Sequence, residues 1–212
     1  MTRVAVIDYG MGNRRSVEKA LEHVGAQVVM TSDHDELRRS DGLVLPGVGA
    51  FPQAMRNLDG LGLPELIREL VDQGKPLLGI CLGMQLLLDT SEEMGGAAGL
   101  GLIGGQVTRL TADGLRVPHI GWNEVRFERP SPLTGQLAPS GCAFYHVHSF
   151  AARTRDPEHV IGTAEYGERF ATMVGHDNVF GVQFHPEKSS RNGLRMLHSF
   201  VGVCVGLAGA RA

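Results

Sequence analysis

The 212 residues combine 42% hydrophobic with 20% charged side chains, a balance typical of a globular domain with a sizeable core. A formal net charge of −3 indicates no basic surface for nucleic acid or for a membrane. The first residues lack the basic segment and long apolar run of a signal peptide, and three widely spaced cysteines do not suggest a disulfide framework. We therefore expect a cytoplasmic protein without a membrane span.

Strand and helix patterns alternate in the first half of the chain. Short apolar runs that end at glycine or proline predict strands, and apolar residues at spacings of three and four predict helices. This alternation favours an α/β fold with an open, mostly parallel sheet flanked by helices. The expected strands are Arg3–Asp8, Ala26–Thr31, Gly42–Gly47 and Pro76–Ile80, and the expected helices are Val17–Val24, Gln53–Leu58, Leu63–Gln73 and Leu82–Asp89.

The pattern changes between Gln106 and Thr172. Strand-like segments there are separated by Gly, Pro and Asp turns without helical patterns between them, so we expect an additional region of antiparallel strands. A last strand at Val179–Glu187 and a helix at Gly193–Val201 follow. We place a single domain at residues 1–203 and expect residues 204–212 to form a frayed tail.

Cys81 lies between two glycines, where the predicted strand Pro76–Ile80 ends and a helical pattern begins. Small flanking residues allow the sharp strand-to-helix turn on which many hydrolases carry a nucleophile. At the start of a helix, unpaired N–H groups favour a thiolate, and the N–H of Leu82 could stabilise an oxyanion. The alternative is a small buried cysteine that only packs, and this segment alone leaves both interpretations open.

A histidine near the end of the chain could act as the base for this cysteine. His185 follows an apolar strand, and Glu187 faces the same way in an extended segment, so its carboxylate can orient the imidazole. If the two strands are neighbours in a parallel sheet, His185 reaches the edge that carries Cys81. The alternative is a strand-end histidine beside a surface carboxylate. His146 and His148 alternate along another strand but lack further ligands, so we expect no metal site.

Three motifs together resemble the class I glutamine amidotransferases, in the order and at the separations of that family. The resemblance extends over nearly the whole chain. It implies an enzyme without a cofactor that hydrolyses glutamine through a thioester, with Cys81, His185 and Glu187 as its triad. The motifs are LPGVGAF at Leu45–Phe51, GICLGMQ at Gly79–Gln85 and GVQFHPE at Gly181–Glu187.

The same resemblance implies which residues surround the triad. The oxyanion donors are the N–H of Leu82 and an N–H from the loop of Gly47, Val48 and Gly49. The glycines of this loop permit a close approach and a peptide flip. The residues expected to bind glutamine are Gln85, Glu93 and Gly47.

A finer resemblance, to the glutaminase subunits of imidazole glycerol phosphate synthase, rests on the segments DYGMGN, PHIGWN, VHSF and HPEKSS. It implies a heterodimer with a (β/α)8-barrel cyclase that takes up the ammonia through a channel in histidine biosynthesis. His146 stands where an aromatic or apolar residue is usual, and Phe150 where tyrosine is common. The residues expected at the interface are Asn13, Trp122 and Lys188, with a core aromatic as the alternative for Trp122.

Other functions stay open at this point. The chain could be the glutaminase subunit of another synthase, or a stand-alone γ-glutamyl-type cysteine hydrolase that needs no partner. A degenerate subunit that only completes a complex would have lost a triad residue or a glycine of the oxyanion loop, and the sequence retains all of them.

Overall fold

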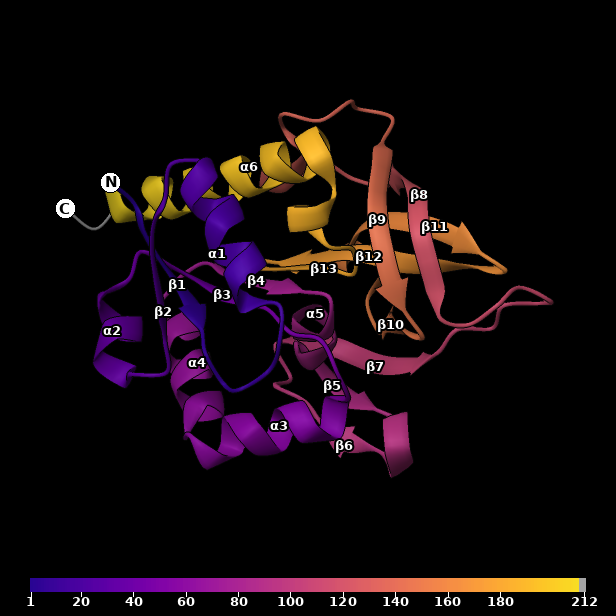
Figure 1. The fold of residues 1–212 in the computed structure, drawn as a ribbon, viewed down its shortest axis with the longest axis horizontal. Coiled ribbons are helices and arrows are strands. Elements are labelled where there is room, and N and C mark those ends of the chain that lie inside the picture. Colours follow the sequence, from indigo (N-terminus) through magenta and orange to yellow (C-terminus); the bar gives the residue numbers. More distant parts are fainter. Residues whose placement is uncertain (210–212) are drawn as a thin grey trace.

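The structure, a computed structural model, describes residues 1–209 and contains a large mixed sheet with helices on both faces (Figure 1). Its parallel part has the strand order β2-β1-β3-β4-β13. The predicted fold class is therefore confirmed. These parallel strands are β1 (Arg3–Ile7), β2 (Gln27–Thr31), β3 (Gly42–Leu45), β4 (Leu77–Ile80) and β13 (Val179–Val182).

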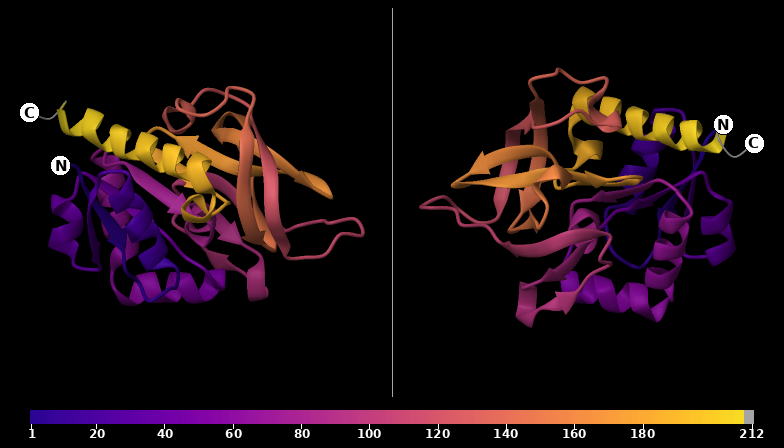
Figure 2. Two further views of the ribbon diagram at one scale, coloured as in Figure 1. Left: turned by 45° about the horizontal axis from the view of Figure 1, so that its top comes forward. Right: turned by 180° about the vertical axis from the view of Figure 1, so that it is seen from behind.

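Each face of the parallel strands is covered by its own helices (Figures 1 and 2). Val4 and Val6 of β1 pack in one core with α1 and α6, whereas Ala5 and Ile7 pack in another with α3 and α4. This separation follows from the alternation of side chains along a strand. The helices are α1 (Arg14–His23), α2 (His34–Arg39), α3 (Phe51–Gly60), α4 (Leu63–Asp72), α5 (Leu82–Leu86) and α6 (Ser190–Gly209).

The antiparallel region begins at β12 (Glu168–His176), which pairs with β13 and continues the sheet through β10, β7, β5 and β6. The pairs along this run are antiparallel except for that of β5 with β7, which is parallel. A branch from β12 through β11 leads to β8, which pairs with β9. The strands of this region are β5 (Leu88–Ser91), β6 (Ala97–Ala98), β7 (Ile103–Arg109), β8 (His119–Phe127), β9 (Cys142–His148), β10 (Phe150–Thr154) and β11 (Val160–Tyr166). Short 3-10 turns are η1 (Glu93–Gly95), η2 (Pro132–Thr134), η3 (Pro157–His159) and η4 (Pro186–Lys188).

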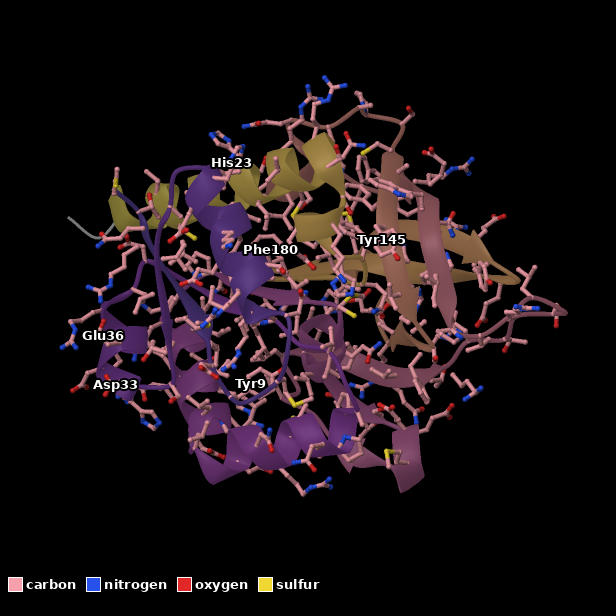
Figure 3. The ribbon with its side chains drawn as sticks, viewed as in Figure 1. Tyr9, His23, Asp33, Glu36, Tyr145 and Phe180 are labelled. Carbon is pink, nitrogen blue, oxygen red and sulfur yellow. The ribbon has the colours of Figure 1, made fainter. Side chains whose placement is uncertain are left out.

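Some elements differ from the sequence-based expectation. α2 was not expected, and its first turn is capped by the Asp33 side chain, which accepts from the Glu36 N–H at 2.9 Å (Figure 3). The helix that begins after Cys81 ends at Leu86 rather than at Asp89, because the next residues pair with β7 as strand β5.

The C-terminal part also differs from the expectation. The last strand ends at Val182 rather than at Glu187, and η4 follows His185. α6 continues through residues 204–209, which were expected to fray, and its residue Cys204 is buried in the core. Residues 210–212 of the expected tail lie outside the described residues, and the domain limit at residue 203 stays a prediction. No helix within residues 1–209 is both long and apolar enough to cross a membrane.

Candidate active site

Cys81 stands at a strained turn between β4 and α5. Its backbone has φ 54° and ψ −108°, a conformation that costs a residue other than glycine about 1–3 kcal/mol. Neither flank has room for a side chain. A Cβ on Gly79 would lie 2.6 Å from the Gly83 carbonyl oxygen, and one on Gly83 would overlap the carbonyl oxygen of Leu45. The packing therefore requires the two glycines that predicted this turn.

Sheet pairing brings Cys81 and His185 to the same edge. β4 and β13 are parallel neighbours, with Ile80 opposite Val182, and the Cys81 N–H donates to the Val182 carbonyl at 2.8 Å. The His185 N–H donates to the Tyr145 carbonyl at 2.8 Å, which ties the residue to β9. In this arrangement Cys81 and His185 border the same cavity, and the sulfur is close enough to raise the pKa of the imidazole.

Glu187 holds the other side of the imidazole. Its Oε1 lies 2.8 Å from His185 Nδ1, and the exposed fractions of the two side chains are 0% and 2%. Asn13 Nδ2 donates to the same oxygen at 2.7 Å and lies 3.3 Å from His185 Nδ1. Because Nδ1 faces the carboxylate, Nε2 is the nitrogen left to bond the sulfur of Cys81.

The charge state of His185 follows from these contacts. Burial works against the charged ring, but the hydrogen bonds and charges of Cys81 and Glu187 outweigh it and raise the pKa of His185 to about 9. The imidazole is therefore protonated at neutral pH. A thiol, an imidazole and a carboxylate in this sequence form the arrangement that activates a cysteine nucleophile.

The N–H of Leu82, an expected oxyanion donor, is already engaged. It donates to the Gly47 carbonyl at 3.3 Å. A Cβ on Gly47 would overlap the hydroxyl of Tyr9, which donates to the Pro46 carbonyl at 2.7 Å and so supports the loop (Figure 3). The Gly47 carbonyl thus accepts from the N–H that an oxyanion would need.

A cavity of ≈ 270 Å³ opens beside the sulfur. Gln85 Nε2 donates to the Phe150 carbonyl at 3.1 Å, and Glu93 Oε2 accepts from the Phe51 N–H at 2.8 Å, so both side chains are anchored in its walls. All the expected oxyanion and substrate residues except Gly47 border this space. The lining residues are Val48, Gly49, Cys81, Leu82, Gln85, Glu93, Val147, His148, Ser149, Phe150, His185 and Lys188.

The family model described as glutamine amidotransferase class-I matches residues 5–206. The chain belongs to this family. A protein of Moorella thermoacetica named imidazole glycerol phosphate synthase subunit HisH is 54% identical over 200 residues, which cover 94% of each chain. Another protein of that name, from Geobacillus thermodenitrificans, is 49% identical over 211 residues, which cover 97% of this chain and 98% of the relative.

Two solved structures share the fold at lower identity. A putative GMP synthase component from Thermoplasma acidophilum has a TM-score of 0.77 and 22% identity, with 100% of this chain and 98% of that chain covered. PurLQS from Thermotoga maritima has a TM-score of 0.74 and 22% identity, with coverage of 95% and 98%. The predicted family is confirmed, and the chain is a glutamine amidotransferase.

One residue of this glutamine amidotransferase site was not expected from the sequence. Gln183 is fully buried, its Nε2 donates to Cys81 Sγ at 3.7 Å, and its Oε1 accepts from Gln85 Nε2 at 3.0 Å. The signal is a polar residue in an apolar strand, two positions before His185 and therefore on the same side of an extended chain.

The residues expected at an interface lie in different settings. Trp122 is 55% exposed on β8, beside Ile120 at 59%, and its ring lies edge-on to that of Tyr145 with 6.2 Å between centroids. The alternative of a core aromatic is therefore wrong for Trp122. Lys188 is exposed at the border of the cavity, whereas Asn13 contacts the candidate triad.

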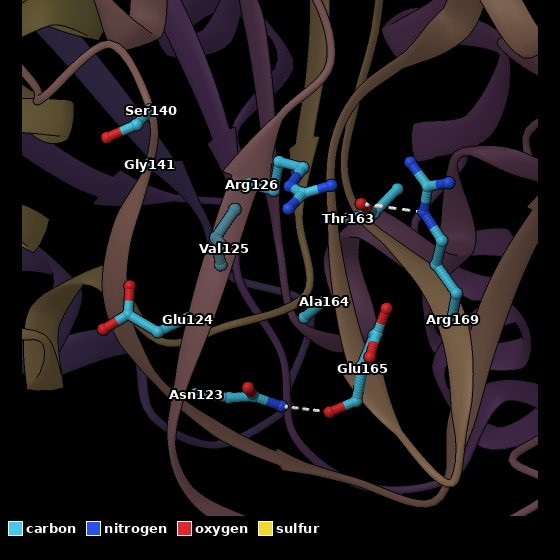
Figure 4. A pocket seen from close by; sticks show the side chains of 10 residues that line it. All are labelled: Asn123, Glu124, Val125, Arg126, Ser140, Gly141, Thr163, Ala164, Glu165 and Arg169. Atoms are coloured by element: carbon cyan, nitrogen blue, oxygen red, sulfur yellow. Dashed lines mark hydrogen bonds between the residues drawn. The ribbon is translucent and has the colours of Figure 1, made fainter.

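A second cavity, of ≈ 490 Å³, lies along β8 and β11 and shares no lining residue with the first (Figure 4). Its polar groups bond one another. Arg169 Nε donates to Thr163 Oγ1 at 3.2 Å and its guanidinium pairs with Glu128 at 2.6 Å, while Asn123 Nδ2 donates to the Glu165 carbonyl at 2.8 Å. We assign no chemistry to this space.

The alternating histidines of β9 bond to protein groups. His146 Nε2 lies 2.7 Å from Thr172 Oγ1, and His148 Nδ1 lies 2.8 Å from the Phe150 carbonyl. Within residues 1–209, no group of three or more His, Cys, Asp or Glu side chains could hold a metal ion.

Proposed function

We propose that this glutamine amidotransferase is the glutaminase subunit of an imidazole glycerol phosphate synthase and supplies ammonia to a (β/α)8-barrel cyclase in histidine biosynthesis. The names of its relatives support the assignment to this synthase. The observation that carries the activity is the contact of Cys81, His185 and Glu187 at the turn after β4, beside a cavity.

In the proposed reaction, Cys81 Sγ attacks the side-chain amide carbon of glutamine. His185, which already holds the proton beside the sulfur, gives it to the leaving nitrogen, so that ammonia and a γ-glutamyl thioester form. Water then attacks the thioester carbon, and His185 accepts a proton from the water as the sulfur leaves, which releases glutamate and restores the starting state of both side chains. Glu187 orients the imidazole and stabilises its charged form.

The cavity walls supply the proposed glutamine-binding groups. Glu93 uses one carboxylate oxygen to hold the Phe51 N–H, which fixes the carboxylate where it can attract the ammonium group of an amino acid. Gln85 lies one turn beyond Cys81 and shapes the wall next to the sulfur. Gly47 does not border the cavity, so its proposed role is limited to the loop, where its carbonyl accepts from the Leu82 N–H.

The oxyanion site needs a change in this loop. We infer that rotation of the peptide between Gly47 and Val48 releases the Leu82 N–H and turns the Val48 N–H toward the substrate. Gly49, with φ 125°, provides conformational freedom next to this peptide. One oxyanion donor is worth ~3–4 kcal/mol, or about two to three decades of rate. A partner that favours the rotated loop would therefore activate the enzyme.

The surface proposed for the cyclase lies on β8 and β9. Ile120 and Trp122 are large apolar side chains left exposed on β8, and Tyr145 packs against the indole. An exposed tryptophan with apolar neighbours is typical of the centre of a protein interface. Lys188, at the border of the cavity, would lie near the path by which ammonia leaves.

Ammonia release from glutamine, measured with and without the cyclase and its bound ligand, tests the proposal. We expect a low rate from the isolated glutaminase and a rise of about a hundredfold or more in the loaded complex. The matched variant Cys81→Ser should abolish release in both. Activation by the partner chain of another synthase would contradict the assignment, and a full rate without a partner would favour a stand-alone hydrolase.

A further inference from the structure

Three buried imidazoles lie side by side behind the wall of the glutamine cavity. The exposed fractions of His119, His146 and His148 are 3%, 0% and 5%. His119 stacks between His146 and Tyr166, with centroid distances of 5.1 and 4.1 Å. The proposed reaction uses none of these rings, although His148 borders the cavity.

Two of the imidazoles form a chain of hydrogen bonds that can run in only one direction. His148 Nδ1 lies 2.8 Å from the Phe150 carbonyl, which can only accept, so Nδ1 carries the hydrogen. His148 Nε2 is then an acceptor, and His119 Nδ1 donates to it at 3.0 Å. His119 Nε2 in turn accepts from Asn123 Nδ2, which lies 3.4 Å away and also donates to the Glu165 carbonyl.

This chain has no place for an additional proton. A protonated His148 would carry an N–H on Nε2, opposite the N–H of His119. Either the bond between the two rings would be lost, or His119 would change its tautomer and lose the bond from Asn123. Burial lowers the pKa of His148 to about 3 and also lowers the pKa of His119, so both rings stay neutral near pH 7. Every nitrogen of the two rings therefore has a fixed role.

The chain ends at the corner between β9 and β10, which forms one wall of the cavity. The Phe150 carbonyl accepts from His148 and also from Gln85 Nε2 at 3.1 Å. At the other end of the corner, the Val147 carbonyl oxygen lies 3.8 Å from Cys81 Sγ. A shift of this corner would therefore move the Val147 carbonyl, which contacts Cys81, and the Phe150 carbonyl, which bonds Gln85.

We propose that His148 and His119 are positioning residues that hold the corner Val147–Phe150 in place as the wall against which glutamine binds. The inference rests on the proposed glutaminase activity. His148 bonds the corner directly, and His119 fixes the ring orientation of His148. His146 lies in the same cluster but outside the chain, since its nitrogens bond the Phe144 carbonyl and the Thr172 hydroxyl.

Four variants of the protein, measured in complex with the cyclase and its ligand, test this role. His148→Leu removes the donor to the corner, whereas His148→Asn keeps a donor at the position of Nδ1. His119→Phe keeps an aromatic ring beside Tyr166 but loses the N–H. His146→Phe is the matched control, because it changes an equally buried ring outside the chain.

We expect the KM for glutamine to rise about tenfold in His148→Leu and in His119→Phe, as for the loss of one buried hydrogen bond. His148→Asn and His146→Phe should stay within about threefold of the unchanged protein. Alkylation of Cys81 by iodoacetamide, followed by peptide mass mapping, should change by less than about threefold in all variants, because this small reagent needs no glutamine wall and loses at most a weak contact of the sulfur with the corner. Thermal unfolding identifies any variant that does not fold, and His119→Phe carries the test if His148→Leu fails.

Two results would overturn the inference. One is an unchanged KM in folded His148→Leu or His119→Phe, and the other is an equal rise of KM in His146→Phe. If the unchanged protein releases no ammonia in the loaded complex, the proposed function itself fails. Normal release with an unaffected KM in the variants would leave the proposed function intact and refute only the role of the histidine chain.

Discussion

Asn13 and His185 approach the same carboxylate oxygen, since Glu187 Oε1 lies 2.7 Å from Asn13 Nδ2 and 2.8 Å from His185 Nδ1. The other oxygen, Oε2, is buried without a hydrogen-bond partner among the residues that the structure describes. A buried carboxylate with few donors depends strongly on each of them. Asn13 is therefore a second support for the group that orients the imidazole.

Replacing Asn13 by alanine should lower kcat of the loaded complex about tenfold, because a hydrogen bond to a charged group is worth about 1.5–3 kcal/mol. Asn13→Asp should lower kcat further, since it places a second carboxylate against Glu187. Steady-state ammonia release checks both, with Arg15→Ala on the exposed side of α1 as control. Equal activity of Asn13→Asp and the unchanged protein would show that the amide does not support Glu187.

Tyr9→Phe should raise the partner-free rate of ammonia release by about fivefold. The Tyr9 hydroxyl donates to the Pro46 carbonyl and holds the loop whose Gly47 carbonyl occupies the Leu82 N–H. Loss of one neutral hydrogen bond, about 1 kcal/mol, favours the rotated loop by that factor. Tyr166→Phe, which removes a hydroxyl bonded to the Arg116 carbonyl elsewhere in the chain, is the matched control. A partner-free rate that does not change in Tyr9→Phe would refute this account of the loop.

Gly83→Ala should destabilise the fold by about 3 kcal/mol or more, because the added methyl group overlaps the Leu45 carbonyl oxygen. Gly202→Ala is the matched control on α6. No atom lies within 4 Å of a Cβ at that position, so alanine should stabilise the helix by up to about 1 kcal/mol. Urea unfolding of both variants measures the difference, and similar stabilities would show that the turn at Cys81 tolerates a side chain.

The sequence was informative where function depends on local backbone geometry. Cys81 between glycines predicted a strand-to-helix turn, and apolar strands ending at Cys81 and His185 predicted a shared sheet edge; the structure has both. The supporting contacts were not predictable, because they join segments far apart in the chain. Asn13 was expected at the partner interface, and Gln183 looked like part of a strand. The pairing of Glu187 with His185 was expected from an extended segment but is made across the turn η4.

The histidine chain could not be derived from the sequence for a related reason. His119 and His148 belong to β8 and β9, and only the register that places them opposite each other brings their rings together. The alternating histidines of β9 suggested metal ligation, although the sequence offered no further ligands beside them. Their partners are instead carbonyl, hydroxyl and imidazole groups, which only the folded arrangement reveals.

The buried histidines should make the protein sensitive to mild acid. Burial lowers the pKa of His146 to about 2 and of His148 to about 3 from the ordinary value of 6.5. Below pH 6.5 the unfolded chain therefore binds protons at these two histidines that the folded chain does not bind. The free energy of unfolding is thus unaffected by the two histidines above pH 6.5, and it falls as the pH drops from 6.5 toward their pKa values in the folded chain. His146→Phe should reduce the loss of unfolding free energy between pH 7 and pH 4 by about 3 kcal/mol. Urea titrations at the two pH values measure this, and an unchanged loss in the variant would contradict burial of a neutral ring.

Trp122→Ala should weaken binding to the cyclase by about 2 kcal/mol, or about thirtyfold in Kd, because large exposed aromatic side chains at an interface centre contribute most of its binding energy. Trp122 lies beside Ile120 on β8, where neither side chain has a core to pack into. Leu61→Ala is the matched control, since Leu61 is also a large apolar residue, 42% exposed, but follows α3 on the opposite side of the sheet from α6. Titration calorimetry with the ligand-loaded cyclase gives both affinities. If Leu61→Ala weakens binding as much as Trp122→Ala, the proposed surface on β8 and β9 is not the cyclase interface.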